Sequence, residues 1–101
     1  MNAQIDETKL LVTILENVGE TPNGDEYEDG SVLSLADFID YLYKDGDYSY
    51  DYANVSDCYP EIRISVCAWT NPIADEPEEV GYILVRLGAY CVDEVIEYMR
   101  E

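Results

Sequence analysis

The chain has 101 residues, of which 48% are hydrophobic and 12% aromatic, and its formal net charge is −18. A chain of this length and apolar content can bury a core of its own, which argues against an intrinsically disordered protein in spite of the charge. We therefore expect one soluble folded domain over residues 1–101.

The N-terminal segment predicts a strand and then a loop. Its apolar run, Leu10–Leu15, is six residues long and follows no basic region, which argues against a signal peptide or a membrane span. We expect a cytoplasmic protein. Residues 8–15, TKLLVTIL, are apolar on both faces, which favours an interior strand. Residues 16–30 are acidic and contain the turn sequences PNGD and EDG, which predict a loop.

A helix is predicted over residues 34–44. Ser34 is a suitable N-cap, and the sequence KDG ends the pattern. Apolar residues recur at helical spacing between these ends, at Leu35, Phe38, Ile39 and Leu42.

Two strands and a second helix are predicted after residue 60. Residues 61–69 alternate apolar and polar side chains, and residues 80–88 predict a strand that returns antiparallel to them. Residues 89–101 predict an amphipathic helix, with an apolar stripe at Val92, Val95, Ile96 and Met99. The expected fold class is α+β: a three-stranded, mainly antiparallel sheet with two helices packed against it, in the order βαββα.

The most unusual segment is residues 45–61, DGDYSYDYANVSDCYPE, where four tyrosines stand among four aspartates and one glutamate without a basic residue. If residues 47–53 are extended, they form an edge strand with alternate side chains on opposite faces. Its tyrosines, Tyr48, Tyr50 and Tyr52, would then share one face, and the other face would carry an acidic row.

Metal binding and catalysis are not predicted. The segment DGDYSYD has the alternating oxygen ligands of an EF-hand loop, but position six lacks the glycine and position twelve the glutamate that such a loop needs. The chain has no histidine, and its three cysteines include no C-x-x-C pair, so we expect no zinc site and three reduced thiols, Cys58, Cys67 and Cys91. Because a glycine-rich phosphate loop and a nucleophile with a nearby base are also missing, we expect a non-enzymatic protein without a cofactor.

The negative charge is concentrated in the first part of the chain. Glu16–Glu61 contains 13 acidic residues and one lysine, which gives this segment a net charge of −12. Carboxylates in rows reproduce the charge of a nucleic-acid backbone, and tyrosine is enriched at binding hot spots. The residues expected to contact a partner are Asp25, Glu26, Glu28, Asp29, Asp37, Asp40, Asp45, Asp47, Tyr48, Tyr50, Asp51, Tyr52 and Asp57.

In size, in charge and in the stretches NGDEYEDG and DGDYSYDYANVSDCYPE, the chain resembles the small acidic nucleic-acid-mimic inhibitors of phages and mobile elements, the anti-CRISPR and antirestriction proteins. The resemblance implies an inhibitor that blocks the basic DNA- or RNA-binding groove of a Cas effector or a restriction enzyme, and that binds neither nucleic acid nor a membrane. The chain is similar on equal terms to the acidic immunity proteins and antitoxins that neutralise a basic nuclease. A generic acidic protein-interaction domain is the third interpretation.

Overall fold

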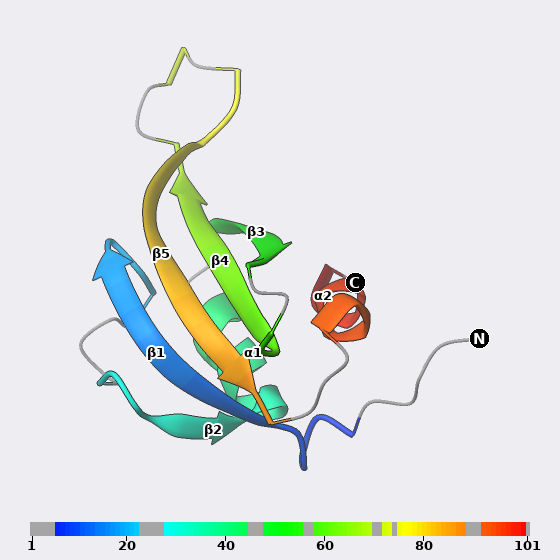
Figure 1. Cartoon of the computed structure of the whole chain (residues 1–101). Coiled ribbons are helices and arrows are strands. Elements are labelled where there is room, and N and C mark those ends of the chain that lie inside the picture. The colour runs from blue at the N-terminus through cyan, green and yellow to red at the C-terminus, as the bar shows by residue number, and fades with distance from the viewer. Residues whose placement is uncertain are drawn as a thin grey trace.

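An antiparallel sheet of five strands carries two helices (Figure 1). The computed structural model of the chain describes residues 6–22, 28–44, 48–55, 58–69, 72–73, 75–88 and 92–100. The strands lie in the order β2-β1-β5-β4-β3, and each neighbouring pair is antiparallel. The elements in chain order are β1 (Leu11–Gly19), β2 (Val32–Ser34), α1 (Leu35–Tyr43), β3 (Ser49–Asn54), β4 (Glu61–Ala68), β5 (Glu78–Leu87) and α2 (Val92–Arg100).

The predicted three-stranded sheet and the βαββα order are wrong, because β2 and β3 are strands as well. Both of these strands lie at an edge of the sheet and pair with one neighbour each. β2 has three residues and runs directly into the N-cap of α1, so it is too short to show an alternating pattern. β3 is the extended edge strand considered for residues 47–53, and its inward side chains are aromatic rather than aliphatic.

The first strand also lies further along the chain than predicted. β1 ends at Gly19, so part of the predicted acidic loop is paired with β5. A register shift between Ile14 and Glu16 marks a bulge in this pairing. Gly19 then ends the strand with a φ of +75°, and a Cβ atom there would lie 2.6 Å from the carbonyl oxygen of Val80. Only glycine combines this conformation with such a close backbone approach.

Both predicted helices are confirmed: α1 lies within the predicted residues 34–44, and α2 within the predicted residues 89–101, of which 89–91 and 101 lie outside the described residues. The hydroxyl of Ser34 accepts a hydrogen bond of 3.2 Å from the backbone N–H of Asp37, which caps α1. α1 buries Leu35, Phe38, Tyr41 and Leu42. α2 buries the whole predicted stripe, Val92, Val95, Ile96 and Met99.

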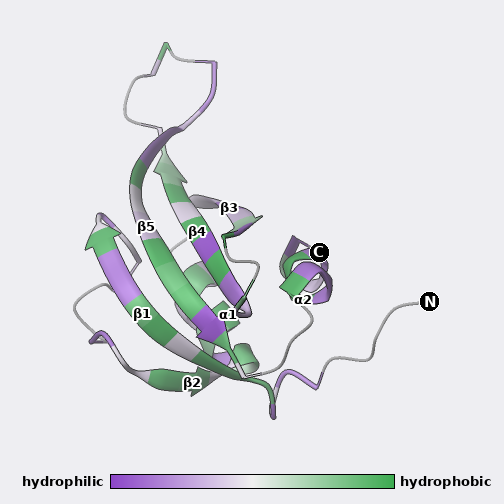
Figure 2. Cartoon of the chain, in the orientation of Figure 1, coloured by the Kyte–Doolittle hydropathy of each residue, from purple (hydrophilic) through white to green (hydrophobic). Residues whose placement is uncertain are grey.

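The helices cover one side of the sheet. α1 packs against β1 and β2, α2 packs against β3 and β4, and all the buried side chains form a single core. The strands alternate between this core and the other side, as the hydropathy of β4 shows (Figure 2). Full burial of one aliphatic side chain stabilises the fold by about 1.5–3 kcal/mol. The side chains of the sheet that reach zero exposure are Val12, Ile14, Ile62, Ile64, Val66 and Ile83.

The other side of the sheet is covered by none of the described helices and strands, and we call it the open face. Its side chains alternate along each strand with those of the core. It is formed by Leu11, Thr13, Glu16, Val18, Val32, Ser49, Asp51, Ala53, Glu61, Arg63, Ser65, Cys67, Glu79, Tyr82, Leu84 and Arg86.

Candidate partner-binding surface

The acidic residues predicted to contact a partner do not lie on one surface. Asp51 is exposed on the open face, where it pairs in register with Ser65 of β4. Asp37 and Asp40 are exposed on α1, which packs on the opposite side of the sheet. Glu28 and Asp29 are exposed in the turn before β2. The remaining predicted acids, Asp25, Glu26, Asp45, Asp47 and Asp57, lie outside the described residues.

Tyr50 and Tyr52 share the face of β3 that points into the core, and Tyr48 lies just before this strand. Tyr52 is 6% exposed, so its ring is not available to a partner in this structure. Tyr48 and Tyr50 are half-buried and pack against the same core. The candidate partner-binding surface therefore does not include these three tyrosines.

Tyr50 and Tyr52 instead connect β3 to the C-terminal end of α1, and Tyr43 of α1 in turn contacts the C-terminal end of α2. The hydroxyl of Tyr43 donates to the carbonyl oxygen of Met99 at 3.4 Å, and it lies 2.9 Å from the hydroxyl of Tyr52. Since Tyr43 has one hydroxyl proton, Tyr52 is the donor in their shared bond. Burial and this bond raise the pKa of Tyr52. Tyr50 donates to the carbonyl oxygen of Leu42, and its ring meets that of Tyr43 edge to face at 5.6 Å.

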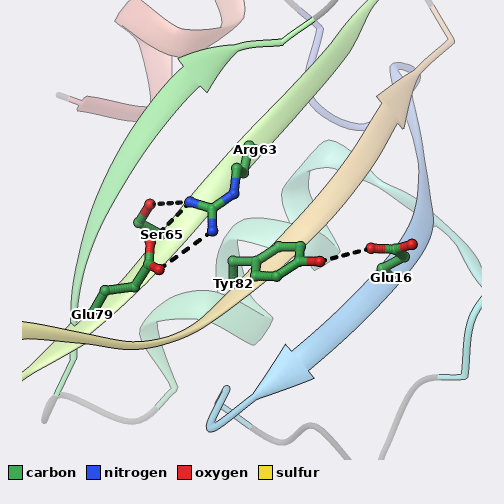
Figure 3. A network of polar contacts seen from close by, with 5 residues as sticks. All are labelled: Glu16, Arg63, Ser65, Glu79 and Tyr82. Carbon is green, nitrogen blue, oxygen red and sulfur yellow. Dashed lines mark hydrogen bonds and ion pairs between the residues drawn. The ribbon is translucent and has the colours of Figure 1, made fainter.

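On the open face, one arginine lies at the centre of a network that crosses three strands (Figure 3). Arg63 of β4 donates to both carboxylate oxygens of Glu79, at 2.8 and 3.3 Å, and to the hydroxyl of Ser65 at 2.8 Å. Its guanidinium lies 4.3 Å from the ring centre of Tyr82, whose hydroxyl donates to Glu16 of β1 at 3.0 Å. Hydrogen bonds from Arg63 and Ser65 lower the pKa of Glu79 to about 2.

The second arginine of the sheet is also engaged. Glu61 and Arg86 are register partners on β4 and β5, and Nε of Arg86 lies 2.9 Å from Oε2 of Glu61. The guanidinium also lies 4.8 Å from the ring centre of Tyr59. The open face therefore balances much of its negative charge with two arginines from its own strands.

The two helices carry a larger excess of negative charge than the open face does. α1 contains no basic residue, and the one in α2, Arg100, lies in the last turn and donates to the carbonyl oxygen of Tyr52 at 3.3 Å. Lys44 follows α1 as its C-cap. Five exposed carboxylates lie on the two helices, and the name acidic helix face is used for this set: Asp37 and Asp40 on α1, and Asp93, Glu94 and Glu97 on α2.

The three acids of α2 were missed by the sequence analysis. They stand opposite the apolar stripe in the amphipathic pattern of residues 89–101, but the partner-binding residues were predicted from the denser negative charge before residue 61. On a helix, residues three apart rise about 4.5 Å along the axis, and one strand of DNA carries one negative charge for about every 3.4 Å of its axis, so carboxylates at this separation give a line of charge of similar order. The pairs Asp37–Asp40 and Glu94–Glu97 have this separation.

The described residues also bear on metal binding, on the thiols and on membrane insertion. They include no group of three or more His, Cys, Asp or Glu side chains that could hold a metal ion. The EF-hand-like aspartates Asp45 and Asp47 lie outside them, as does Cys91. Cys58 is exposed and Cys67 half-buried, with no disulfide between them, and burial raises the pKa of the Cys67 thiol. No helix in the described ranges has the length and apolar character needed to cross a bilayer.

Comparisons with known proteins add no relative to these observations. No protein-family model, no curated protein and no solved structure matches the chain.

Proposed function

We propose that this chain is a non-enzymatic inhibitor that presents a nucleic-acid-like acidic surface and blocks the basic DNA- or RNA-binding groove of a host defence protein, such as a Cas effector or a restriction enzyme. It acts in the cytoplasm of the host cell. The observation that carries the proposal is the separation of charge across the fold. Arg63 and Arg86 are held in ion pairs on the open face, whereas the five carboxylates of the acidic helix face lie on the other side of the sheet.

A groove lined with lysine and arginine is the surface that complements the acidic helix face. Such a groove attracts a negative partner over a Debye length of about 8 Å at physiological salt, and steering of this kind raises association rates by about 10- to 1,000-fold. Both helices are fixed to the core by buried side chains, so the carboxylates are positioned before the partner arrives. The competing nucleic acid would be excluded because the two ligands need the same cations.

Two matched variants test this proposal. The helix-face variant carries Asp37→Asn, Asp40→Asn, Asp93→Asn, Glu94→Gln and Glu97→Gln. The control variant also neutralises five exposed carboxylates, all outside the helices and outside the residues predicted to contact a partner: Asp6→Asn, Asp75→Asn, Glu20→Gln, Glu76→Gln and Glu78→Gln. Each removes five negative charges from a total of −18, so a difference between the variants reports on where the charge lies.

The three proteins are first used in parallel as bait at low salt in cells that carry a defence system, and the captured protein is identified by mass spectrometry. That protein, and a guide-loaded Cas effector as a defined target, are then tested for binding of a labelled DNA duplex. The parent should exclude the duplex, less effectively as salt rises, and the helix-face variant should associate on the order of tenfold more slowly. Simultaneous binding of duplex and parent, or an equal loss in the control variant, would contradict the proposal.

A further inference from the structure

The open face combines exposed apolar side chains with charges of both signs. Leu11, Val18 and Val32 are 50%, 43% and 56% exposed, and all three lie on β1 and β2. Tyr82 and Leu84, half-buried in the adjacent β5, pair in register with β1 across the same face. One half of the open face is therefore largely apolar, and the other half holds the ion pairs of Arg63 and Arg86.

We propose that the open face is a homodimer interface, in which the sheets of two copies of this chain pack face to face about a two-fold axis. The dimer does not depend on the proposed inhibitory function, because it uses the side of the sheet that the helices leave uncovered. It would leave both acidic helix faces accessible.

The area of the face is sufficient for a weak dimer. With about 3.3 Å per residue along a strand and about 4.8 Å between strands, the five strands give each copy a face of on the order of 600 Å². Stable interfaces bury about 800 Å² per partner, and weaker, transient ones bury less. Aligned sheets pack about 10 Å apart, which lets side chains of the size of leucine and valine interdigitate.

The charges favour contact between two copies through the open face and disfavour contact through the helices. In a two-fold interface each patch meets itself, so an arginine of one copy can approach a glutamate of the other. Arg63 and Arg86 already lie on glutamates of their own chain and enter the interface as ion pairs, so Glu16 and Asp51 are the carboxylates of this face that neither arginine compensates. Contact through the acidic helix face would instead bring five carboxylates against five more.

Long-range repulsion points the same way. Two chains of charge −18 repel one another, and the arrangement with the smallest penalty keeps the most acidic surfaces apart. In the face-to-face dimer two sheets lie between the helical layers. With layers about 10 Å apart, the helical layers of the two copies are separated by about 30 Å, several times the Debye length of about 8 Å.

Sedimentation equilibrium of the full chain, from 5 to 500 μM in roughly 0.15 and 0.5 M NaCl, tests the proposal. We expect a monomer–dimer equilibrium with a dissociation constant in the micromolar range, tighter at the higher salt because repulsion is screened. Leu11→Lys and Val18→Lys should each weaken the dimer about tenfold or more. Ile73→Lys, at an 87% exposed position between β4 and β5, changes the charge equally and should leave the dimer intact.

The sign of the charge change makes these variants informative. Each lysine reduces the net negative charge, so electrostatics alone would strengthen association, and a weaker dimer must come from lost apolar contact. Dilution followed by NMR locates the interface without any variant: backbone signals of Thr13 and Leu84 should shift with concentration, and those of Asp40 and Glu97 should not. A monomer at 500 μM in high salt, equal weakening by Ile73→Lys, or shifts confined to the helices would overturn the proposal.

Discussion

Replacement of Tyr52 distinguishes a tyrosine that holds the fold together from one that waits for a partner. The sequence analysis placed this side chain in a contact surface, whereas the structure buries its ring and pairs its hydroxyl with Tyr43. Tyr52→Ala removes the ring from the core and leaves a cavity, and truncation of a buried aromatic residue costs about 3–5 kcal/mol. Tyr52→Phe keeps the ring and removes one hydrogen bond, worth about 0.5–1.5 kcal/mol.

These energies convert to melting temperatures that are easy to separate. For a domain of about 100 residues, 1 kcal/mol corresponds to about 4–8 °C, so Tyr52→Phe should lower the melting temperature by about that amount and Tyr52→Ala by about 12 °C or more. Tyr59→Ala is the control, because Tyr59 is exposed and its contact with the Arg86 guanidinium is worth about 1 kcal/mol or less.

Circular dichroism during heating, with urea unfolding as a second measurement, checks both values. A Tyr43→Phe, Tyr52→Phe double-mutant cycle then isolates the coupling between the two hydroxyl groups. If Tyr52→Ala melts within a few degrees of the parent, Tyr52 is not part of the core and the arrangement of β3 described above is incorrect.

Three further predictions concern stability. Gly81→Ala should destabilise the protein severely, because a Cβ atom there would lie 2.3 Å from a backbone oxygen, whereas Gly30→Ala, with φ +92° and no atom within 4 Å, should cost about 1 kcal/mol from conformation alone; urea unfolding compares them. The lowered pKa of Glu79 means that its contacts with Arg63 and Ser65 stabilise the fold above its ordinary pKa of 4.5 and are lost as the pH falls towards about 2, so the difference in melting temperature between the parent and Glu79→Gln should close over that range. Because the net charge is −18, the melting temperature should rise with added NaCl at neutral pH, and a flat response would show that repulsion does not limit stability.

The elements that the sequence predicted well are those with one strong hydrophobic period. β4 alternates aliphatic and polar side chains over its full length, and α2 places four apolar residues on one stripe. Each pattern identifies both the element and its buried side, because no other conformation brings those residues together. Ser34 marked the beginning of α1 in the same way, through the hydrogen bond that a serine hydroxyl offers a helix N-terminus.

β3 shows why the rest was harder to predict. Alternation placed Tyr48, Tyr50 and Tyr52 on one face, but a tyrosine ring suits either a core or a binding surface, so the pattern could not tell which side was inward. That choice depends on the helices that cover the strand: the hydroxyls of Tyr50 and Tyr52 bond to the end of α1, and α2, which packs against β3, begins 38 residues after β3 ends. The balance of charge on the open face could not be predicted for a similar reason, since Arg63 contacts Glu79 only because β4 pairs with β5.

The tyrosines of residues 45–61 also have a structural role at the end of a helix. The last carbonyl groups of a helix lack partners within the helix, and this end attracts positive charge, so lysine or arginine is common there. The last turn of α1 has no basic residue, although Lys44 follows it as the C-cap, and the carbonyl oxygen of Leu42 accepts a hydrogen bond from the hydroxyl of Tyr50. The end of α2 differs, because Arg100 lies in its last turn and its Met99 carbonyl accepts from Tyr43 of α1. A neutral hydroxyl satisfies a carbonyl without adding a cation, so it leaves the negative charge of the acidic helix face undiminished. Tyrosine in this segment therefore supplies both the apolar ring that a core needs and an uncharged donor for the end of α1.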